Sequence, residues 1–522
     1  MNNRTHSAAP EPAPVTQAPA ATTVAAAVAG ILAGAVVLGA GHLVAAFFAP
    51  DASPVYVIGA TVVDTTPRPL KEWAIREFGS ADKAVLFLVM AVVMTLAAAC
   101  AGLLDRRHRY GSALLAIAGA GVMWAAVRRP DATIGWALPT LVGLIAGIGT
   151  LRLLLDRAPG VSGDGALFTR RRFLGLAVTA GALAAGSAAL GEWIGARLRD
   201  VTADRAGFAV PSPAFPAPPI AEGTDLPIDG LTDFVTSNHA FYRVDTALRL
   251  PALTSEDWRL RIHGMVARPV EYTFADLRRR AAVARMITLT CVSNEVGGDL
   301  AGNALWTGYP LADLLSEAGP APGADMVLSR SIDGFTASTP LAALTDGRDA
   351  LLAVGMNDAP LPVAHGYPAR LVVPGLYGYV SATKWVVELE VTRFDAAQAY
   401  WTRRGWAERA PVKTASRIDV PRERATLPAG PIIVAGVAWA QQSGIDLVEV
   451  QVDDQPWQPA TLAAEYSIDT WRQWWWRWQA EPGTHTVRVR ATDRTGYRQT
   501  DRRTPPFPDG ATGWHSRTII VR

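Results

Sequence analysis

Cys291 is the residue whose type and setting point most directly to chemistry. An apolar segment, Met286 to Thr290, is expected to form a strand that runs straight into it. The chain then continues Val-Ser-Asn-Glu-Val-Gly-Gly-Asp-Leu-Ala-Gly-Asn, where Gly297, Gly298 and Gly302 allow the backbone to approach a ligand closely. The thiol could be a buried inert side chain, a nucleophile served by a histidine base, or a soft ligand for a metal. A single cysteine does not decide among these three interpretations.

The composition divides the chain into an apolar beginning and a mixed remainder. Of the 522 residues, 50% are hydrophobic and only 18% are charged, whereas an average soluble protein has about 25% charged residues. The deficit falls almost wholly within the first two hundred positions. A formal net charge of +2, without a stripe of basic and aromatic residues, argues against nucleic-acid binding. The two cysteines, Cys100 and Cys291, do not make a disulfide framework.

Five segments near the N-terminus are long and apolar enough to cross about 30 Å of hydrocarbon. Residues 1–200 are therefore predicted to form a helical membrane bundle of about five spans, in contact with the lipid bilayer, in a multi-pass protein of the cell membrane. His42 is the only histidine within a span, which argues against haem held by paired imidazoles and favours a packed polar contact between helices. The expected spans are 23–48, 84–104, 111–127, 133–155 and 173–195.

Basic residues predict the orientation of this bundle. The densest basic flanks are 105–109 and the segment that holds Arg157 and Arg170 to Arg172, and the positive-inside rule places both in the cytoplasm and the C-terminal part on the extracytoplasmic side. The motif Thr-Arg-Arg-Arg-Phe-Leu at 169–174 resembles a twin-arginine export signal, which would move a folded domain; an ordinary basic helix flank is the alternative. The basic excess is modest, because six basic residues fall on the outer side: Arg68, Lys71, Arg76, Lys83, Arg128 and Arg129.

Two regions are expected to follow the bundle before the C-terminal part. Residues 201–233 are predicted to be a Pro-rich linker, because the run Val-Pro-Ser-Pro-Ala-Phe-Pro-Ala-Pro-Pro at 210–219 favours a stiff polyproline II spacer. Residues 234–400 mix short strands and helices and predict an α+β domain. Thr273 with Asp276 forms a capping box, and Pro310 and Gly319 mark the start and end of a further helix.

Residues 401–522 are expected to contain strands alone. Val448 and Val450 alternate with Glu449 and Gln451, which is the two-residue period of a half-buried sheet. Strands of this kind predict an immunoglobulin-like β-sandwich, in which two sheets bury their apolar faces against each other. The tryptophan-rich run at 471–478 favours core and interface packing over the stacking of sugars or bases.

The motifs around Cys291 resemble the sulfite oxidase family of molybdopterin-dependent oxidoreductases, in its bacterial membrane-anchored form. The resemblance spans about 234–522. Its most specific motifs are Thr-Cys-Val-Ser-Asn at 290–294, Ala-Leu-Trp-Thr-Gly-Tyr-Pro-Leu at 304–311, and His-Gly-Tyr-Pro-Ala-Arg-Leu-Val-Val-Pro-Gly at 365–375. The C-terminal strands look like that family's dimerisation domain, through the segments 436–439 and 448–453.

The resemblance implies a molybdenum-molybdopterin cofactor, with Cys291 as the catalytic protein thiolate on molybdenum. Arg370 would fork onto phosphate and Lys384 would supply a point charge. Without the motif, the alternatives are a structural ion pair for Arg370 and a core position for His365. The positions that match the family's pterin contacts are Asn238, Tyr242, Arg243, Ser331, His365, Arg370, Ser381, Ala382, Thr383 and Lys384.

The activity that this resemblance implies is two-electron oxygen-atom transfer on a small sulfur or nitrogen oxide, with an unidentified electron-transfer partner and a homodimer formed through the C-terminal domain. A sulfoxide reductase of the periplasmic methionine-sulfoxide reductase type and a non-catalytic membrane receptor or adhesion module are the alternatives. Glu295 and Val296 stand where animal and plant sulfite oxidases have an arginine pair, and Val354 stands where they have an active-site tyrosine. Because a carboxylate at Glu295 would repel an anion, we expect a neutral or zwitterionic substrate in preference to sulfite.

Overall fold

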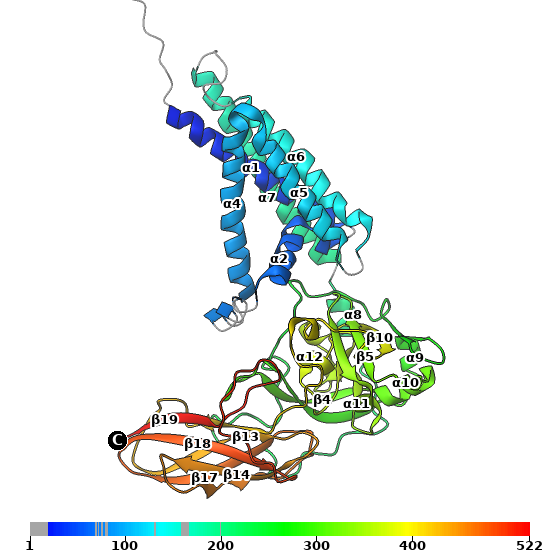
Figure 1. The fold of residues 1–522 in the computed structure, drawn as a ribbon, viewed down its shortest axis with the longest axis vertical. Helices are drawn as coiled ribbons and strands as arrows, with labels where there is room; N and C mark the ends of the chain where they lie inside the picture. The colour runs from blue at the N-terminus through cyan, green and yellow to red at the C-terminus, as the bar shows by residue number, and fades with distance from the viewer. Residues whose placement is uncertain are drawn as a thin grey trace, which may run out of the picture. The chain divides into compact units, whose positions relative to one another are not determined.

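The computed structural model describes residues 19–47, 49–67, 70, 73–74, 77–78, 82–129, 132–157, 166–198 and 200–522. The chain forms two compact units, which we call the helical unit (Met1–Asp200) and the mixed unit (Val201–Arg522) (Figure 1).

Within its described residues, the helical unit contains five helices that are long and apolar enough to cross a membrane. Their apolar spans are Thr23–Ala46, Lys83–Arg106, Tyr110–Val127, Ile134–Leu155 and Arg171–Gly207, close to the five expected from the sequence. The helices are α1 (Pro19–Ala46), α4 (Asp82–His108), α5 (Tyr110–Val127), α6 (Leu138–Leu155) and α7 (Ala166–Leu198), with a 3-10 turn at Ile134–Ala137.

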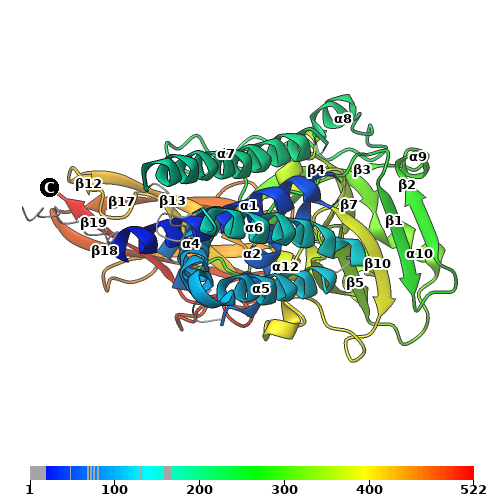
Figure 2. The same ribbon diagram turned by 90° about the horizontal axis from the view of Figure 1, so that it is seen from above.

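Helix α1 packs against α4, α6 and α7 (Figure 2). Small residues permit this close packing, because a Cβ atom at Gly30 would collide with the backbone of α4 at Ala98 and Gly102, and one at Gly39 would collide with the Ala184 carbonyl of α7. Between helices in a membrane, such close packing takes the place of hydrophobic burial as the stabilising term.

His42 makes the polar contact that was predicted for it. Its Nδ1 lies 2.9 Å from Ser53 Oγ, and its Nε2 lies 3.3 Å from Glu192 Oε2 on α7. Ser53 precedes an additional short helix, α2 (Pro54–Thr65), after a 3-10 turn at Pro50–Ala52. At twelve residues α2 is too short to cross the bilayer, and it was not among the helices predicted from the sequence.

Some residues used to predict orientation lie outside the described part of the chain. These are Arg68, Lys71 and Arg76, and the side chains of Arg107, His108, Thr169 and Arg170. The backbone of 169–174 lies in the first turns of α7. The export signal and the orientation stay predictions.

Residues 201–233 differ from the separate linker that was expected, because they pack on the mixed unit. After α8 (Thr202–Gly207), the buried Phe208 ring contacts Tyr367 edge-to-face at 5.7 Å between centroids. The Pro-rich run forms no helix, as predicted, and it pairs with a strand at one point: Ala214 N–H donates to the Ala282 carbonyl (2.7 Å), and Ala284 N–H donates to the Phe215 carbonyl (3.0 Å). These pairs form because the alternating prolines leave Ala214 and Phe215 free to bond along a strand edge.

The middle of the mixed unit contains two sheets and short helices. One sheet has the strand order β2-β1-β10-β5-β6, and the other has the order β3-β4-β7-β8, with β9 paired to β7. The strands are β1 (Arg259–Gly264), β2 (Val270–Thr273), β3 (Val283–Thr290), β4 (Ala301–Pro310), β5 (Met326–Ser331), β6 (Thr336–Pro340), β7 (Leu351–Met356), β8 (Ala359–Pro360), β9 (Arg370–Val372) and β10 (Val386–Thr392).

Helix boundaries in this region follow the predicted signals. Thr273 and Asp276 form the capping box of α9 (Phe274–Leu277), and Pro310 and Gly319 flank α10 (Leu311–Ala318). The remaining helices are α11 (Leu341–Thr345) and α12 (Gly378–Ser381), with 3-10 turns at Val363–His365 and Thr402–Arg404.

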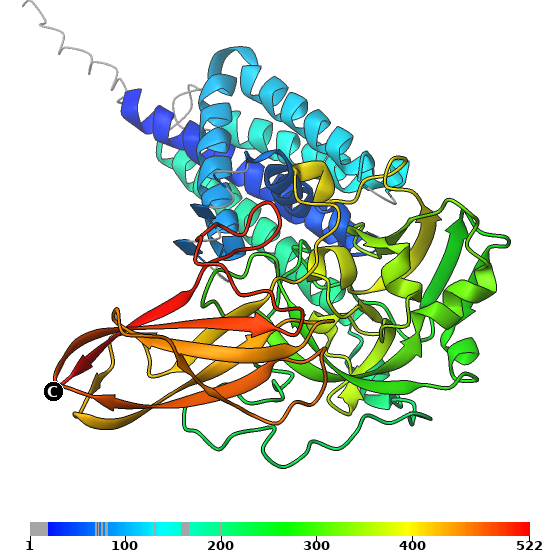
Figure 3. The same ribbon diagram turned by 60° about the horizontal axis from the view of Figure 1, so that its bottom comes forward.

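The C-terminal region consists of two sheets that form the layered orange and red part of Figure 3. Their strand orders are β11-β13-β17-β16 and β12-β19-β18-β14-β15. Val448 and Val450 are buried and alternate with partly exposed residues, as predicted; the immunoglobulin-like connection of the strands stays a prediction. The strands are β11 (Ala415–Val420), β12 (Thr426–Leu427), β13 (Gly430–Trp439), β14 (Ile445–Val452), β15 (Gln458–Pro459), β16 (Thr461–Leu462), β17 (Arg472–Ala480), β18 (Gly483–Asp493) and β19 (His515–Val521).

The middle and C-terminal regions share one hydrophobic core. Trp471, just before β17, is 1% exposed; its backbone N–H donates to Thr288 Oγ1 on β3 (2.8 Å), and its indole N–H donates to the Phe234 carbonyl (2.9 Å). Trp439 of β13 belongs to the same buried cluster as Ile287 of β3. The tryptophan run therefore packs in the core and between the two regions, as its alternation indicated.

Candidate functional site around Cys291

Cys291 directly follows β3 and begins the loop that leads to β4. Its N–H donates to the Leu300 carbonyl (2.9 Å), and its carbonyl accepts from Asn294 N–H (3.1 Å), so the loop closes on itself. The side chain is 8% exposed, and burial raises the pKa of the Cys291 thiol, while hydrogen bonds with Ser293 act in the opposite direction. Among the described residues no histidine forms a hydrogen bond with this thiol: His365 bonds to Asn238 and His515 to Ile418. A histidine base for the nucleophile interpretation is therefore not in place there. A metal, in contrast, would deprotonate the thiol by coordinating it.

The three glycines of this loop are closely packed against other residues of the protein. Gly297 has φ +82°, and a Cβ atom there would collide with the His515 ring. A Cβ atom at Gly298 would lie 2.5 Å from Asn294 Oδ1, and one at Gly302 would lie 2.7 Å from the Phe241 ring. At the Cβ positions of these glycines the space is filled by the protein's own side chains, so glycine is needed there for packing; a close approach of a ligand to this backbone stays a prediction.

Arg370, the first residue of β9, is a buried cation held without a carboxylate. Its Nη1 donates to the His365 carbonyl (3.1 Å), its Nη2 donates to the Ala382 carbonyl (3.4 Å), and its guanidinium carbon lies 5.0 Å from the centroid of the Trp306 ring. Burial lowers the pKa of Arg370 to about 10, and among the described residues only Tyr242 opposes this effect. A structural ion pair is thereby excluded for the described part of the chain. A buried cation without a counter-charge favours an anionic ligand beside it.

His365 connects this arginine to the segment before β1. Its Nε2 lies 3.1 Å from the Asn238 carbonyl, which makes Nε2 the donor and leaves Nδ1 as an acceptor. Asn238 in turn donates through Nδ2 to the Met356 carbonyl (3.1 Å) and accepts from Asn357 Nδ2 (2.8 Å). Burial, together with the charges of Arg370 and Lys384, lowers the pKa of His365 to about 4. The imidazole is therefore neutral at pH 7.

Lys384 and Arg243 share one buried carboxylate. Lys384 Nζ and Arg243 Nε each lie 2.8 Å from the same oxygen of Asp245, whose side chain is 4% exposed. Lys384 also donates to the Ala364 carbonyl (3.1 Å), next to His365. Burial lowers the pKa of Lys384 to about 8, against the opposing effect of Asp245. Arg370 lies within electrostatic reach of Lys384 and lowers its pKa further. Among these described residues, the three cations therefore outnumber the one carboxylate.

Tyr242 links this cationic cluster to the thiol. Burial raises the pKa of Tyr242 well above its ordinary value, Cys291 acts in the same direction and Arg370 in the opposite one. The phenol therefore lies within electrostatic reach of both the cysteine and the arginine, and it stays protonated at pH 7.

The remaining predicted residues have structural contacts in the described part of the chain. Ser381 Oγ donates to the Leu376 and Tyr377 carbonyls (3.1 and 3.0 Å), and Thr383 Oγ1 lies 2.7 Å from Ser329 Oγ. Ala382 accepts the hydrogen bond from Arg370 described above. Ser331 lies at the β5–β6 turn, where its hydroxyl accepts from Asp333 N–H (3.4 Å), and no hydrogen bond joins it to another predicted residue.

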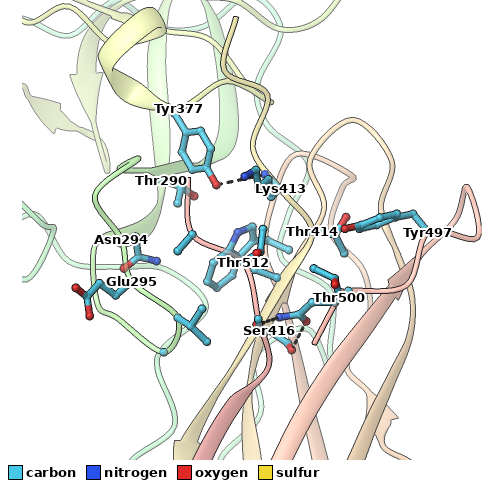
Figure 4. Close-up of a pocket in the computed structure, with 17 residues that line it drawn as sticks. Thr290, Asn294, Glu295, Tyr377, Lys413, Thr414, Ser416, Tyr497, Thr500 and Thr512 are labelled. Carbon is cyan, nitrogen blue, oxygen red and sulfur yellow. Dashed lines mark hydrogen bonds between the residues drawn. The ribbon is translucent and has the colours of Figure 1, made fainter. Parts of the chain in front are cut away.

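A small cavity of about 30 Å³ lies beside the Cys291 loop (Figure 4). Thr290 and Asn294 line one side of it, Tyr377 and Lys413 a second side, and residues of the C-terminal region, such as Thr512, the rest. Thr290 Oγ1 is buried and has no hydrogen-bond partner within the described part of the chain, so its hydroxyl can bond a small polar ligand. Lys413 Nζ already donates to Asp509 Oδ1 (2.9 Å) and to the Gly510 carbonyl (2.7 Å).

Glu295 lies at the edge of this cavity. Its side chain is exposed, and Figure 4 shows its carboxylate directed away from Lys413 and Thr512. Because water screens an exposed charge strongly, the predicted repulsion of anions by Glu295 is weaker than the sequence suggested.

The C-terminal region holds the Cys291 loop from its other side. Arg417 on β11 is 7% exposed; its Nη1 donates to the Gly298 carbonyl (2.9 Å), and its Nε donates to Asp419 Oδ1 (2.6 Å). The His515 ring lies against Gly297 and accepts the Ile418 N–H at Nδ1 (2.9 Å). These contacts fix the loop that follows the cysteine.

The donor set fits an anionic cofactor that carries a soft metal. Cys291 supplies a soft donor, and the cations around Arg370 favour phosphate. No group of three or more His, Cys, Asp or Glu side chains in the described part of the chain could hold a metal by itself. Asp245, Trp306, Tyr377 and Lys413 were not assigned roles from the sequence; only Trp306 lay in a motif that could have indicated one.

Comparisons with known proteins match this part of the chain. Residues 247–401 match the family model described as the oxidoreductase molybdopterin binding domain. Sulfite oxidase of Gallus gallus is 28% identical over 290 residues, which are 47% of this chain and 62% of that protein. The uncharacterised oxidoreductase YuiH of Bacillus subtilis is 30% identical over 149 residues, which are 28% of this chain and 72% of that protein.

One solved structure with similarity to the chain is the sulfane dehydrogenase SoxCD from Paracoccus pantotrophus. It is 24% identical, with a TM-score of 0.49, and the match covers 58% of this chain and 88% of that one. The chain spans about half to three-fifths of the length of the first curated relatives that it matches.

Proposed function

The chain belongs to the sulfite oxidase family of molybdopterin oxidoreductases, and on this premise we propose that its mixed unit performs two-electron oxygen-atom transfer at a molybdenum-molybdopterin centre. The observation that carries the proposal is the pairing of a buried thiol, Cys291, with a buried Arg370 that has no carboxylate partner among the described residues. Either feature alone has a structural explanation. Together, linked through Tyr242, they match a soft metal carried by a phosphate-bearing cofactor.

In this proposal, one side chain of the site coordinates the metal and several others bind the rest of the cofactor. When bound, the cofactor supplies a metal that exchanges an oxygen atom and two electrons with a substrate. Cys291 would be the protein ligand to that metal. Arg370 and Lys384 would neutralise the phosphate, and His365, neutral at pH 7, would offer Nδ1 as an acceptor to the heterocycle. The other proposed cofactor contacts are Asn238, Tyr242, Arg243, Ser331, Ser381, Ala382 and Thr383.

The proposed substrate is a small, neutral or zwitterionic oxide of sulfur or nitrogen. The cavity beside the Cys291 loop is small, about 30 Å³, and it offers the hydroxyl of Thr290, which has no hydrogen-bond partner among the described residues. The one lysine that lines it, Lys413, is already paired with Asp509. The cavity therefore lacks the surplus positive charge that a dianion such as sulfite would need.

The proposed setting is the cell membrane. The helical unit would span the bilayer, and the mixed unit would work on the extracytoplasmic side after export in folded form under the signal at 169–174. An electron-transfer partner and a homodimer formed through the C-terminal sheets complete the proposal.

Metal analysis of the purified full-length protein, with turnover of sulfur and nitrogen oxides by an artificial electron carrier, tests the function. We expect about one molybdenum per chain from a host that makes the cofactor. Cys291→Ser should abolish turnover with little change in the unfolding temperature, since a soft ligand is lost and hardly any core volume. Cys100→Ser, an exposed position in the helical unit, is the matched control and should keep full activity. Protein without molybdenum, or an active Cys291→Ser variant, would refute the proposal.

A further inference from the structure

The helical unit contains a cavity of about 510 Å³ between α1, α2 and α7. Small and aliphatic side chains, such as Ala35, Leu38 and Ala188, form most of its wall. Three polar side chains also line it, namely His42, Tyr56 and Glu192. The volume lies within the range of about 300–1,000 Å³ that is common for small-molecule sites.

The polar side chains gather at one end of the helices. His42 lies four residues before the end of α1 at Ala46, and Glu192 lies six residues before the end of α7 at Leu198. Their side chains are 3.3 Å apart, and Ser53 Oγ lies 2.9 Å from the other imidazole nitrogen. Polar and ionisable side chains inside membrane helices are costly and mark functional positions by default.

An aromatic group stands beside this polar pair. The Tyr56 ring lies 6.0 Å from the His42 ring, and the Phe87 ring lies edge-on to Tyr56, also at 6.0 Å. Aromatic rings at such distances favour another flat ring over flexible acyl chains. The end of the cavity therefore suits a planar ring that carries hydrogen-bonding oxygens.

The charges that line the cavity exclude the commonest lipid headgroups. Among the described residues, the lining includes a carboxylate, Glu192, and no lysine or arginine. A phosphate placed there would lie beside this carboxylate without a lining cation to balance its charge. A neutral ring with hydroxyl or carbonyl oxygens would lie beside the imidazole of His42, the phenol of Tyr56 and the carboxyl group of Glu192. Together these three side chains can donate and accept hydrogen bonds.

We propose that this cavity binds the ring of a lipid-soluble quinone or quinol. The apolar wall would hold the start of the isoprenoid tail, and His42, Tyr56 and Glu192 would bind the ring oxygens. The quinone/quinol couple exchanges two electrons together with two protons, which is the number of electrons that the proposed oxygen-atom transfer exchanges. That partnership rests on the proposed function, whereas the binding of the ring does not.

Binding is measured with the full-length protein in phosphatidylcholine nanodiscs, to which decylubiquinone is added while tryptophan fluorescence is recorded. Trp193 follows Glu192 directly, so a ring bound beside Glu192 should quench it. We expect saturable quenching in the unmodified protein. Ala188→Phe, which fills the cavity, should weaken the affinity at least tenfold, and Glu192→Gln should weaken it severalfold. Ala189→Phe is the matched control, because Ala189 is exposed and does not line the cavity, and it should bind as the unmodified protein does.

Two results would overturn the proposal. Quenching that rises linearly with the probe, or equal affinity in Ala188→Phe and Ala189→Phe, would show partition into the bilayer and no site. Displacement of the probe by phosphatidylglycerol at similar concentrations would identify a lipid site. Cys291→Ser protein, which lacks the proposed metal ligand, should bind decylubiquinone normally, so a failure of the proposed catalytic function and a failure of this inference give different results.

Discussion

Replacing Arg370 with methionine separates a cofactor-binding role from a structural one. Arg370 is a buried cation bound by backbone carbonyls and the Trp306 ring. Methionine keeps most of the apolar volume and removes the charge. If Arg370 serves an anionic cofactor, the change should leave the empty fold nearly as stable as before and should sharply reduce the amount of cofactor retained.

The magnitude follows from the contacts of Arg370. Burial lowers the pKa of Arg370 from 12.5 to about 10. Because one pKa unit corresponds to about 1.4 kcal/mol, keeping the guanidinium charged lowers the free energy of unfolding by about 3 kcal/mol. Methionine relieves this cost but removes the donor to three carbonyls, those of His365, Leu371 and Ala382, at about 1 kcal/mol each. It also loses a cation–π contact of about 0.5–1 kcal/mol. The terms nearly cancel. In the holoprotein, a lost charge-assisted hydrogen bond to phosphate is worth about 1.5–3 kcal/mol, which is roughly a 10- to 100-fold loss of cofactor affinity.

The assay compares urea unfolding of cofactor-free protein with molybdenum content after expression in a cofactor-competent host. Arg280→Met is the matched control, because Arg280 is partly buried and paired with Glu317 (Nη2 to Oε2, 2.8 Å). Arg280→Met should lower stability and leave the molybdenum content unchanged. If Arg370→Met instead lowers the free energy of unfolding of the empty protein by about 3–5 kcal/mol, as expected for a broken buried ion pair, or keeps its molybdenum, the assignment of Arg370 fails.

Three other changes test the export signal, the packing against the Cys291 loop and the substrate charge. Replacing Arg170 and Arg171 with lysine should leave the first helices inserted but keep the mixed unit in the cytoplasm, since lysine preserves charge and not the twin-arginine pattern; full protease accessibility from the outer side would contradict this. Burial lowers the pKa of His515 from 6.5 to about 4, so the folded protein resists a proton that the unfolded chain accepts. The contribution of neutral His515 to the free energy of unfolding is fully present above about pH 6.5 and should fall by up to about 3 kcal/mol toward pH 4. In urea titrations at a series of pH values, His515→Gln should reduce this dependence of stability on pH. Glu295→Arg should change kcat/KM for sulfite by less than about tenfold, because the side chain is exposed and directed away from the cavity, where water and salt screen its charge; a hundredfold gain in steady-state assays would place this carboxylate inside the pocket.

Elements whose signals are local could be predicted from the sequence. The capping box of Thr273 and Asp276 and the boundaries at Pro310 and Gly319 depend on hydrogen bonds and backbone angles within a few residues, and the structure has them where they were expected. The apolar strand that ends at Cys291 was likewise expected, because its burial on both faces requires a continuous run of apolar side chains.

Partners that are distant in the sequence could not be predicted in this way. Lys384 and Asp245 are 139 residues apart, and no local pattern in the chain indicates that they meet. That Arg370 lacks a carboxylate depends on every element that packs around it. Lys413 reaches the cavity beside Cys291 from a segment without a motif. Composition also predicted that 210–219 would be extended, but not that it would pair along β3.

The anchoring of β3 by Trp471 has a consequence for how long a bound cofactor would stay in place. Trp471 N–H donates to Thr288 Oγ1, and Gln441 Nε2 donates to the Thr288 carbonyl (2.6 Å), three residues before Cys291. Parting the C-terminal sheets from the middle region would therefore pull on the strand that carries the metal ligand. The residence time of the cofactor should equal the lifetime of the folded state, so that the loss of molybdenum and the unfolding of the mixed unit occur at one rate.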